Sequence, residues 1–267
     1  MDLGLTTNTN TQYTKPKFDP TVKEFKPITT SLNPGATEFI PFNSQNNPID
    51  NTPVDNISVS TYNILSTFRT VDVKETSEQS SERYGKILEQ IRDSESDIFL
   101  LQEVDLVFVQ KAKEFIKTNR LELYIIGPHL FNPRKMDTIG VLVIINNLKV
   151  TFINDLTHIC QTKYSQIYER PVPFRGIHLT VSVNGIPINI CNIHHSRQIM
   201  GVGLDIQLQN TLYSFIETMK EKNTSEYPLI IGGDFYYSGL EIASYLNTYI
   251  KNKCFNVQIA ENTSYHK

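Results

Sequence analysis

A chain of 267 residues has room for one sizeable domain with a tail, or for two small domains. Its hydrophobic and charged fractions, 39% and 20%, are those of an ordinary soluble protein, so we expect a packed core. The formal net charge of −3 excludes a general attraction to phosphates. Any nucleic-acid contact therefore has to come from a local basic groove.

Three cysteines are present, at positions 160, 191 and 254, and none of them has the spacing of a metal motif. An odd number fits a reducing compartment better than a disulfide framework, and we expect buried thiols. The N-terminus lacks the basic and apolar regions of a signal peptide, and no run approaches the roughly 18 apolar residues of a membrane span. We therefore expect an intracellular, soluble protein without a membrane partner.

The first segment, residues 1–56, is rich in Thr, Asn and Pro and has neither a helical nor a strand period. Its prolines recur too often for a helix or a central strand to persist. We expect a disordered tail here and a folded domain over residues 57–267. One stretch of the tail, SLNPGATEFIPF at 31–42, nevertheless carries apolar groups for which a solvated linker has no use.

Regular elements begin at Ile57. In chain order the hydrophobic periods predict a strand over 57–65, a helix over 81–93, a strand over 97–104, a helix over 106–118 and a short strand over 123–127. Two hairpins are predicted next, 139–145 with 148–153 around Asn146-Asn147, and 174–183 with 186–193 around Asn184-Gly185. A helix over about 204–221, a buried strand over 227–234 and a helix over about 239–251 follow. This mixture predicts an α/β sandwich of layered sheets with helices outside.

Polar residues stand where four of the predicted strands stop. They are Asn63 in the first strand, Glu103 in the second, Asn192 with His194 and His195 in a later one, and Asp234 in the last. Taken singly, an Asn or Asp that closes a strand is typical of a turn or a helix cap. Glu103 is harder to explain in that way, because a carboxylate after Phe99-Leu100-Leu101 must reach solvent or be neutralised. A hard divalent cation such as Mg²⁺ is a common partner for such a group.

Together these segments resemble the endonuclease/exonuclease/phosphatase superfamily, which includes deoxyribonuclease I, abasic-site endonucleases, inositol polyphosphate phosphatases and deadenylases of the carbon-catabolite-repressor type. The markers, in order, are T-Y-N-I-L, L-Q-E, a strand ending N-x-H, and I-x-G-D-F. KMDTIGVLVI also resembles the K-x-D-G-x-A strand of the deadenylase branch, with Thr-Ile where Gly is usual. The resemblance covers about residues 57–267 and implies a four-layer α/β sandwich of the deoxyribonuclease I-like type.

The same resemblance implies a phosphodiesterase that uses Mg²⁺, with Mn²⁺ as the alternative metal. Glu103 would be the metal ligand, and Asn63 beside it would orient the metal or a phosphate oxygen. Asp234 would orient and deprotonate the attacking water, and His194 would donate a hydrogen bond to a phosphate oxygen.

Three further residues are weaker candidates for phosphate contacts: Arg175, Lys135 and His195. A solvated surface position is the simpler interpretation of Lys135. Neighbouring side chains at a strand end alternate, so His194 and His195 are not expected to face the same site.

The sequence departs from the superfamily pattern in two places. Tyr236 stands two residues after Asp234, where G-D-x-N has an Asn, and tyrosine supplies no amide oxygen. The pattern also continues with a strand carrying an Asp and a closing strand ending S-D-H, whereas this sequence reaches NTSYHK, the segment that precedes those strands. We therefore expect a sheet without its last strands. A truncated chain, a partner chain that completes the sheet, and a domain that has lost catalysis are the alternatives.

The tail stretch resembles the linear motif L-N-x-x-A-x-E-F-x-P, by which mRNA-associated proteins bind the C-terminal helical domain of cytoplasmic poly(A)-binding protein. Every specified position is present, at Leu32, Asn33, Ala36, Glu38, Phe39 and Pro41. Residues 18–27 align with it at a constant offset of 14 as a degenerate copy, with Phe18 in the place of Leu and Phe25 in the place of Phe39. The alternative is that these apolar groups cover a patch of the chain's own domain.

The sequence thus favours a cytoplasmic, poly(A)-directed 3′ exoribonuclease that is delivered to mRNA through poly(A)-binding protein. The first alternative is a catalytically inactive adaptor that binds poly(A)-binding protein. The second is a DNA-repair or inositol-phosphate phosphodiesterase of the same superfamily.

Overall fold

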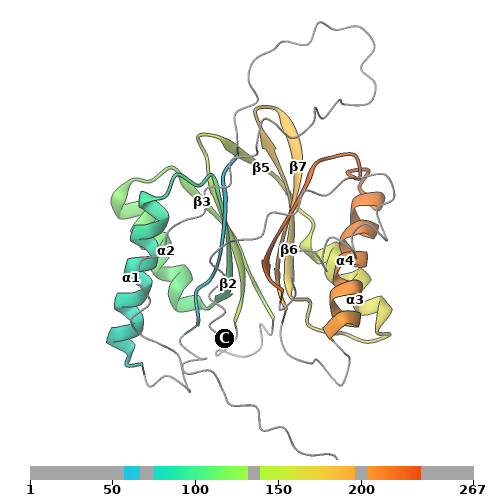
Figure 1. Ribbon diagram of the computed structural model, residues 1–267, viewed down its shortest axis with the longest axis horizontal. Helices are drawn as coiled ribbons and strands as arrows, with labels where there is room; N and C mark the ends of the chain where they lie inside the picture. Colours follow the sequence, from blue (N-terminus) through green and yellow to red (C-terminus); the bar gives the residue numbers. More distant parts are fainter. Residues whose placement is uncertain (1–56, 67–74, 132–138, 196–203, 236–267) are drawn as a thin grey trace, which may run out of the picture.

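Two β-sheets pack face to face in the computed structural model, which describes residues 57–66, 75–131, 139–195 and 204–235 (Figure 1). Helices α1 (Ser77–Asp93) and α2 (Leu106–Asn119) cover the outer face of the first sheet, and α3 (Thr157–Ile167) and α4 (Leu204–Glu221) cover that of the second. The predicted four-layer α/β sandwich is confirmed.

Each sheet has four strands in the described part of the chain, in the orders β1-β2-β4-β3 and β5-β6-β7-β8. The strands are β1 (Val59–Asn63), β2 (Ile98–Val104), β3 (Leu123–Leu130), β4 (Gly140–Asn146), β5 (Val150–Asp155), β6 (Gly176–Val183), β7 (Ile186–His194) and β8 (Leu229–Asp234). β1 pairs with β2 in parallel, and so does β7 with β8. The carboxyl ends of β1 and β2 therefore lie together in the first sheet, and those of β7 and β8 lie together in the second.

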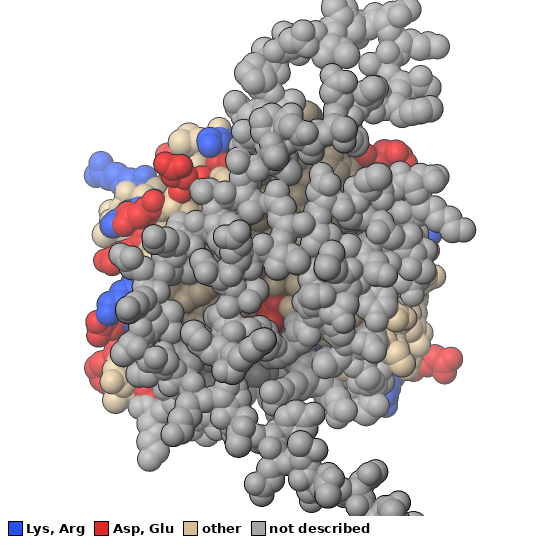
Figure 2. All heavy atoms as spheres, viewed as in Figure 1, with Lys and Arg blue, Asp and Glu red and all other residues tan. Residues whose placement is uncertain are grey.

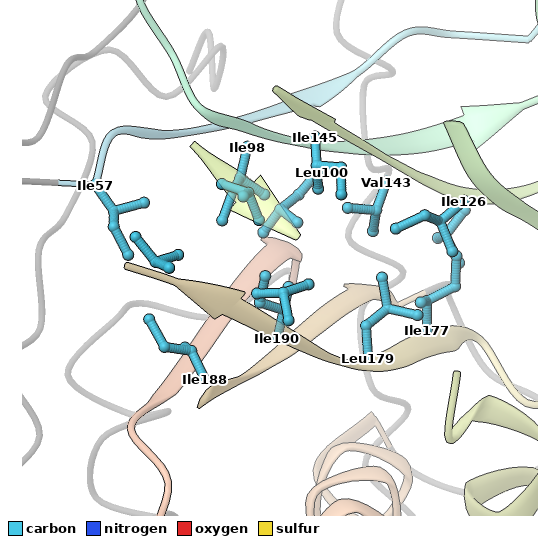
Figure 3. Close-up of a cluster of buried hydrophobic side chains, with 14 of the residues drawn as sticks. Ile57, Ile98, Leu100, Ile126, Val143, Ile145, Ile177, Leu179, Ile188 and Ile190 are labelled. Atoms are coloured by element: carbon cyan, nitrogen blue, oxygen red, sulfur yellow. The ribbon is translucent and has the colours of Figure 1, made fainter. Parts of the chain in front are cut away.

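The interface between the sheets is almost entirely aliphatic. Ile98, Leu100 and Val143 of the first sheet face Ile177, Leu179 and Ile190 of the second (Figure 3). The alternate residues of β2, Phe99 and Leu101, pack instead against α1 and α2. Because both faces of β2 are covered, its first four residues, 98–101, form a continuous apolar run rather than an alternation.

Capping residues fix where the first two helices begin. Thr76 and Gln79 form a capping box, so α1 begins at Ser77, four residues before the start that its apolar period predicted. Asp105 caps α2 by accepting a hydrogen bond of 2.8 Å from the backbone N–H of Phe108. This cap begins α2 directly after β2, so Glu103 lies at the junction between the two elements.

Two predictions about the central region need correction. β4 and β5 do not form a hairpin, because both sides of β4 are occupied by β2 and β3 while β5 pairs with β6. The turn at residues 147–149 instead carries the chain from one sheet to the other. Helix α3 was not predicted at all, because it has no side-chain N-cap and few apolar residues to mark its period. The hairpin around Asn184-Gly185 is confirmed, with positive φ at both turn residues.

Several predictions lie outside the described residues: the tail of residues 1–56, the helix over 239–251 and Cys254. Cys160 and Cys191 are buried free thiols, as predicted. None of the described helices is long and apolar enough to cross a membrane.

A buried polar network links the second sheet to its helices. The Sγ atom of Cys160 in α3 lies 3.2 Å from Nδ1 of His178 in β6 and 3.2 Å from the hydroxyl of Thr218 in α4. The other ring nitrogen of His178 lies 3.2 Å from Oδ1 of Asn189, whose amide donates to the carbonyl of Thr224. Burial raises the pKa of Cys160 to about 12 and lowers the pKa of His178 to about 4. Both groups are therefore neutral, and the network is structural rather than nucleophilic.

This network makes the stability of the fold dependent on pH. The unfolded chain protonates His178 near its ordinary value of 6.5 and the native protein only near 4, so its contribution is lost as the pH falls between these values. We expect the substitution His178→Gln to reduce the slope of the unfolding free energy against pH by up to about 1.4 kcal/mol per pH unit. Urea denaturation between about pH 7 and 4.5 measures this slope. His158→Gln, on the exposed side of α3, is the control and should keep the wild-type slope.

Candidate active site at the carboxyl ends of four strands

Four side chains predicted from the sequence meet where β1, β2, β7 and β8 end. The amide of Asn63 donates a 3.0 Å hydrogen bond to Oδ2 of Asp234. Oε1 of Glu103 lies 3.3 Å from Nε2 of His194. Each of these contacts joins a residue of the first sheet to a residue of the second, so the two sheets contribute equal halves of the site.

Glu103 is held in an unusual backbone conformation. Its φ is +54°, and the register of β2 against β4 shifts between Gln102 and Val104, so Glu103 is the extra residue of a β-bulge. A left-handed conformation costs an L-residue of this size about 1 to 2 kcal/mol. The bulge breaks the alternation of the strand and directs the carboxylate to the strand end, where it is buried beside His194.

Asn63 is fixed by the turn that follows β1. Its Oδ1 accepts a 3.0 Å hydrogen bond from the backbone N–H of Leu65, which has a φ of +52°. The carbonyl of Ile64 accepts from the guanidinium of Arg83 in α1, and Glu75 accepts two hydrogen bonds from the same guanidinium. The turn therefore orients both ends of the Asn63 amide, with its oxygen toward the turn and its nitrogen toward Asp234.

Asp234 owes its position to the glycine before it. Gly233 has a φ of +141°, and a Cβ at this position would overlap the carbonyl of Ile193 in the neighbouring strand. This close approach pairs Asp234 with His194 in the parallel register of β7 and β8. The Asp234 carbonyl then accepts a 2.7 Å hydrogen bond from the backbone N–H of His195. The glycine of I-x-G-D-F, Gly233, is therefore explained by packing against β7.

His194 lies in an aromatic and cationic environment that the sequence did not indicate. The ring of Phe131, the residue after β3, is parallel to the imidazole within 3° at a centroid distance of 5.6 Å. The guanidinium carbon of Arg175 lies 4.9 Å from the centroid of the same Phe131 ring. Arg175 also accepts a 2.9 Å hydrogen bond at its carbonyl from the backbone N–H of His194. The predicted phosphate contact Arg175 is thus close to the site, with Phe131 packed against both residues.

His195 follows the end of β7 and is buried. Burial is the main cause that lowers its pKa to about 4, and the nearby charge of Arg175 acts in the same direction, so His195 is neutral at neutral pH. Two other predicted residues, Lys135 and Tyr236, lie outside the described residues.

Asn192 does not lie among the four meeting side chains. Its Oδ1 accepts a 2.7 Å hydrogen bond from Nε2 of Gln102, and its amide nitrogen donates to the carbonyls of Leu101 and Leu142, both at 2.9 Å. Its side chain therefore crosses from β7 to the first sheet. Gln102 was not singled out from the sequence, because only the position of its partner reveals what it does.

The charged side chains that are visible on the described part of one face do not form a single basic area. Figure 2 shows acidic and basic side chains intermixed on the described flanks of this face. The arrangement agrees with the net charge of −3 and with the absence of a general attraction to phosphates.

Comparison with solved structures identifies the fold. The catalytic domain of human Nocturnin with a bound sulfate matches with a TM-score of 0.55 and 20% identity over 72% of this chain and 69% of that chain. ANGEL2, a 2′,3′-cyclic phosphatase, matches with a TM-score of 0.54 and 19% identity over 71% of this chain and 55% of that one. The complex of ANGEL2 with adenosine-2′,3′-vanadate matches with a TM-score of 0.53 and 20% identity, over 71% of this chain and 56% of that chain.

The protein has the endonuclease/exonuclease/phosphatase fold. The chain spans little more than half of the ANGEL2 structure and about two thirds of the Nocturnin structure. No protein-family model and no curated protein sequence matches it.

The donor set at the strand ends fits a hard cation with few protein ligands. Within the described ranges no group of three or more His, Cys, Asp and Glu residues is placed to hold a metal ion. The oxygen donors at the strand ends are the carboxylate of Glu103, which lies beside His194, and the carboxylate of Asp234, which accepts from the Asn63 amide nitrogen. Mg²⁺ is commonly bound by one or two carboxylates and keeps several waters. A site of this composition therefore suits Mg²⁺ or Mn²⁺ better than a metal that needs a closed cage.

The left-handed backbone at Glu103 can be tested without any assay of activity. We expect Glu103→Gly to be more stable than Glu103→Ala by up to about 1 kcal/mol, because glycine has no Cβ to strain at positive φ. Thr61, an exposed residue of β1, provides the control. There the order should reverse, because glycine weakens an extended strand. Chemical denaturation of the four variants measures both differences, and a lower stability of Glu103→Gly than of Glu103→Ala would contradict the conformation described.

Proposed function

We propose that this protein is a Mg²⁺-dependent phosphodiesterase that acts on RNA, as a poly(A)-directed 3′ exoribonuclease. The observation that carries the proposal is the meeting of Asn63, Glu103, His194 and Asp234 at the ends of strands from both sheets. Phosphodiester hydrolysis needs a group that activates water and groups that stabilise charge on the phosphoryl oxygens. This set of side chains supplies both.

In this mechanism Asp234 accepts the proton of the attacking water. The hydrogen bond from Asn63 to Oδ2 orients the carboxylate for that task. Glu103 is the residue that would hold Mg²⁺. The bound metal would neutralise the charge that develops on the phosphoryl group.

His194 donates a hydrogen bond to a phosphate oxygen in the same mechanism. Its contacts with Phe131 and Glu103 fix the plane of the imidazole before substrate binds. Arg175, packed against the same Phe131 ring, is the second candidate donor to phosphate.

The structural neighbours support chemistry on phosphoryl groups. The Nocturnin catalytic domain binds a sulfate, an analogue of phosphate in charge and shape. ANGEL2 is described as a 2′,3′-cyclic phosphatase and was solved with adenosine-2′,3′-vanadate, which mimics a phosphoryl group on RNA. These likenesses support an RNA substrate for this chain, and the tail motif is the reason to choose poly(A).

The tail would deliver the domain to its substrate in the cytoplasm. Phe39 and Leu32 are the apolar anchors of the motif, and two prolines at 34 and 41 reduce the entropy lost when the segment becomes ordered. The degenerate copy with Phe18 and Phe25 would add avidity, because several poly(A)-binding proteins lie along one mRNA tail.

Activity on oligo(A) is the first test. Purified protein should shorten a 3′-terminal oligo(A) in the presence of Mg²⁺, and Glu103→Gln and Asp234→Asn should each lower kcat at least about 1000-fold. These substitutions keep the shape of the side chain, and Glu89→Gln on the exposed side of α1 is the matched control.

A panel of substrates separates the alternatives. Oligo(C), single-stranded DNA, an RNA with a 2′,3′-cyclic phosphate end and an inositol polyphosphate should react more slowly than oligo(A). A preference for one of the last three would replace poly(A) by that substrate. Hydrolysis of none of them by the full chain would leave the inactive adaptor as the function.

Binding of the tail is the second test. Phe39→Ala should weaken binding of the chain to the C-terminal domain of poly(A)-binding protein at least about 30-fold, a loss typical of a buried aromatic anchor. Phe25→Ala, in the degenerate copy, is the matched control and should change affinity by no more than about threefold. Isothermal titration calorimetry measures both, and equal affinities of Phe39→Ala and wild type would exclude the motif as the binding segment.

A further inference from the structure

A pair of buried amide side chains joins the two sheets directly below the candidate active site. Nε2 of Gln102 in β2 donates to Oδ1 of Asn192 in β7 at 2.7 Å, and it also lies within hydrogen-bond distance of Thr61 Oγ1 and of the Leu100 carbonyl, at 3.1 and 2.7 Å. Both amide side chains are buried, with exposed fractions of 1% and 0%. We call Gln102 and Asn192 the amide clasp.

The amide clasp is adjacent to residues of both halves of the site. Gln102 directly precedes Glu103, and Asn192 lies two residues before His194 on the same strand. Through the Leu101 and Leu142 carbonyls, Asn192 also contacts two strands of the first sheet, β2 and β4. Any sliding of β7 against β2 therefore breaks several of these hydrogen bonds at once.

Around the clasp the contact between the sheets is aliphatic, as Figure 3 shows for the isoleucines, leucines and valines of the two facing sheets. Burial of apolar surface is non-directional and depends little on the exact alignment of two such faces. Hydrogen bonds between buried amides depend strongly on distance and angle. The aliphatic layer therefore holds the sheets together, and the directional contacts set their alignment.

We propose that the amide clasp is a positioning device, which sets the separation between Glu103 and His194 and so the geometry of catalysis. Gln102 and Asn192 act through their neighbours and touch no reacting atom. The proposal rests on the proposed phosphodiesterase function for its effect on catalysis. Its structural part, the local alignment of the strand ends, is independent of that function.

The matched pair of variants is Asn192→Leu and Asn189→Leu. Both residues lie on β7, both have an exposed fraction of 0%, and both accept and donate side-chain hydrogen bonds. Asn189 forms hydrogen bonds with His178 and with the Thr224 carbonyl, on the helix side of the second sheet. Neither of these partners belongs to the amide clasp. Both variants lose a buried amide, but only one of them loses the link between the sheets.

Amide hydrogen exchange provides a measurement that does not depend on activity. The backbone N–H groups of Ile64, His194 and His195 donate hydrogen bonds at the site end of the sheets, and that of Asp97 does so at the opposite end. In Asn192→Leu we expect exchange at the first three to accelerate at least about tenfold relative to Asp97. In Asn189→Leu the ratio of the exchange rates at these three N–H groups to the rate at Asp97 should stay at the wild-type value. If Asn192→Leu does not fold, Gln102→Met replaces it, because this variant keeps the contacts of Asn192 with Leu101 and Leu142.

Kinetics provide the second measurement. A displacement of catalytic groups by about 1 Å costs on the order of 100-fold in rate, so kcat should fall by about this factor in the clasp variants while KM changes by less than about threefold. Asn189→Leu should keep kcat within about threefold of wild type, even if its stability is lowered equally.

The outcomes separate the two proposals. Wild-type exchange ratios in both Asn192→Leu and Gln102→Met overturn the clasp. If the exchange ratios of the clasp variants change but their kcat stays at the wild-type value, the amide clasp is not a positioning device for catalysis. If the wild-type protein hydrolyses no substrate of the panel, the proposed function fails, and the exchange ratios still decide whether the clasp aligns the strand ends.

Discussion

The alignment of two sheets, each of which carries half of the site, is the constraint on which the rest of the structure depends. Asn63 and Glu103 come from the first sheet and His194 and Asp234 from the second, and the two closest contacts among them cross between the sheets. An apolar interface supplies cohesion without fixing a position along the strands. The hydrogen bonds of Gln102 and Asn192 depend on direction, and they fix the position of one sheet along the other. The same hydrogen bonds satisfy the two buried amides.

Three departures from regular backbone geometry lie at the end of the sandwich that carries the candidate site. Leu65 and Glu103 have left-handed φ values, and Gly233 adopts a positive φ at a place where β8 presses against β7. Each departure turns a side chain or a strand end toward the same place. Strain of this kind persists only where the surrounding structure holds it, which here is the packed and hydrogen-bonded end of the two sheets. The regular parts of the fold provide the rigidity, and the irregular ends provide the chemistry.

The sequence predicted most of this arrangement where the information is local. Polar residues after apolar runs mark the strand ends, so Asn63, Glu103, His194 and Asp234 were singled out, and the structure brings them together. The Asn184-Gly185 turn was likewise predicted, because φ > 0 at two adjacent positions has a local signature. Their roles in catalysis stay predictions.

What the sequence did not predict depends on contacts between distant segments. Phe131 ends a strand like any other apolar residue, and only the approach of β7 gives it His194 as a neighbour. Gln102 looks like a polar residue beside Glu103 until Asn192, ninety positions away, is placed against it. The false hairpin between β4 and β5 has the same origin, since local turn chemistry does not state which sheet the next strand joins.

The charge of the molecule agrees with the proposed roles of the tail and the domain. A protein with a net charge of −3 and intermixed surface charges gains little from counterion release on a polyanion. Its own affinity for RNA would therefore be low, and a 3′ exonuclease with such a surface needs another source of local concentration. A tail that binds a protein already seated on poly(A) raises the effective concentration of substrate at the site without adding any phosphate contact. Delivery to mRNA would then depend mainly on the tail, and the preference for oligo(A) over other substrates would depend on the domain.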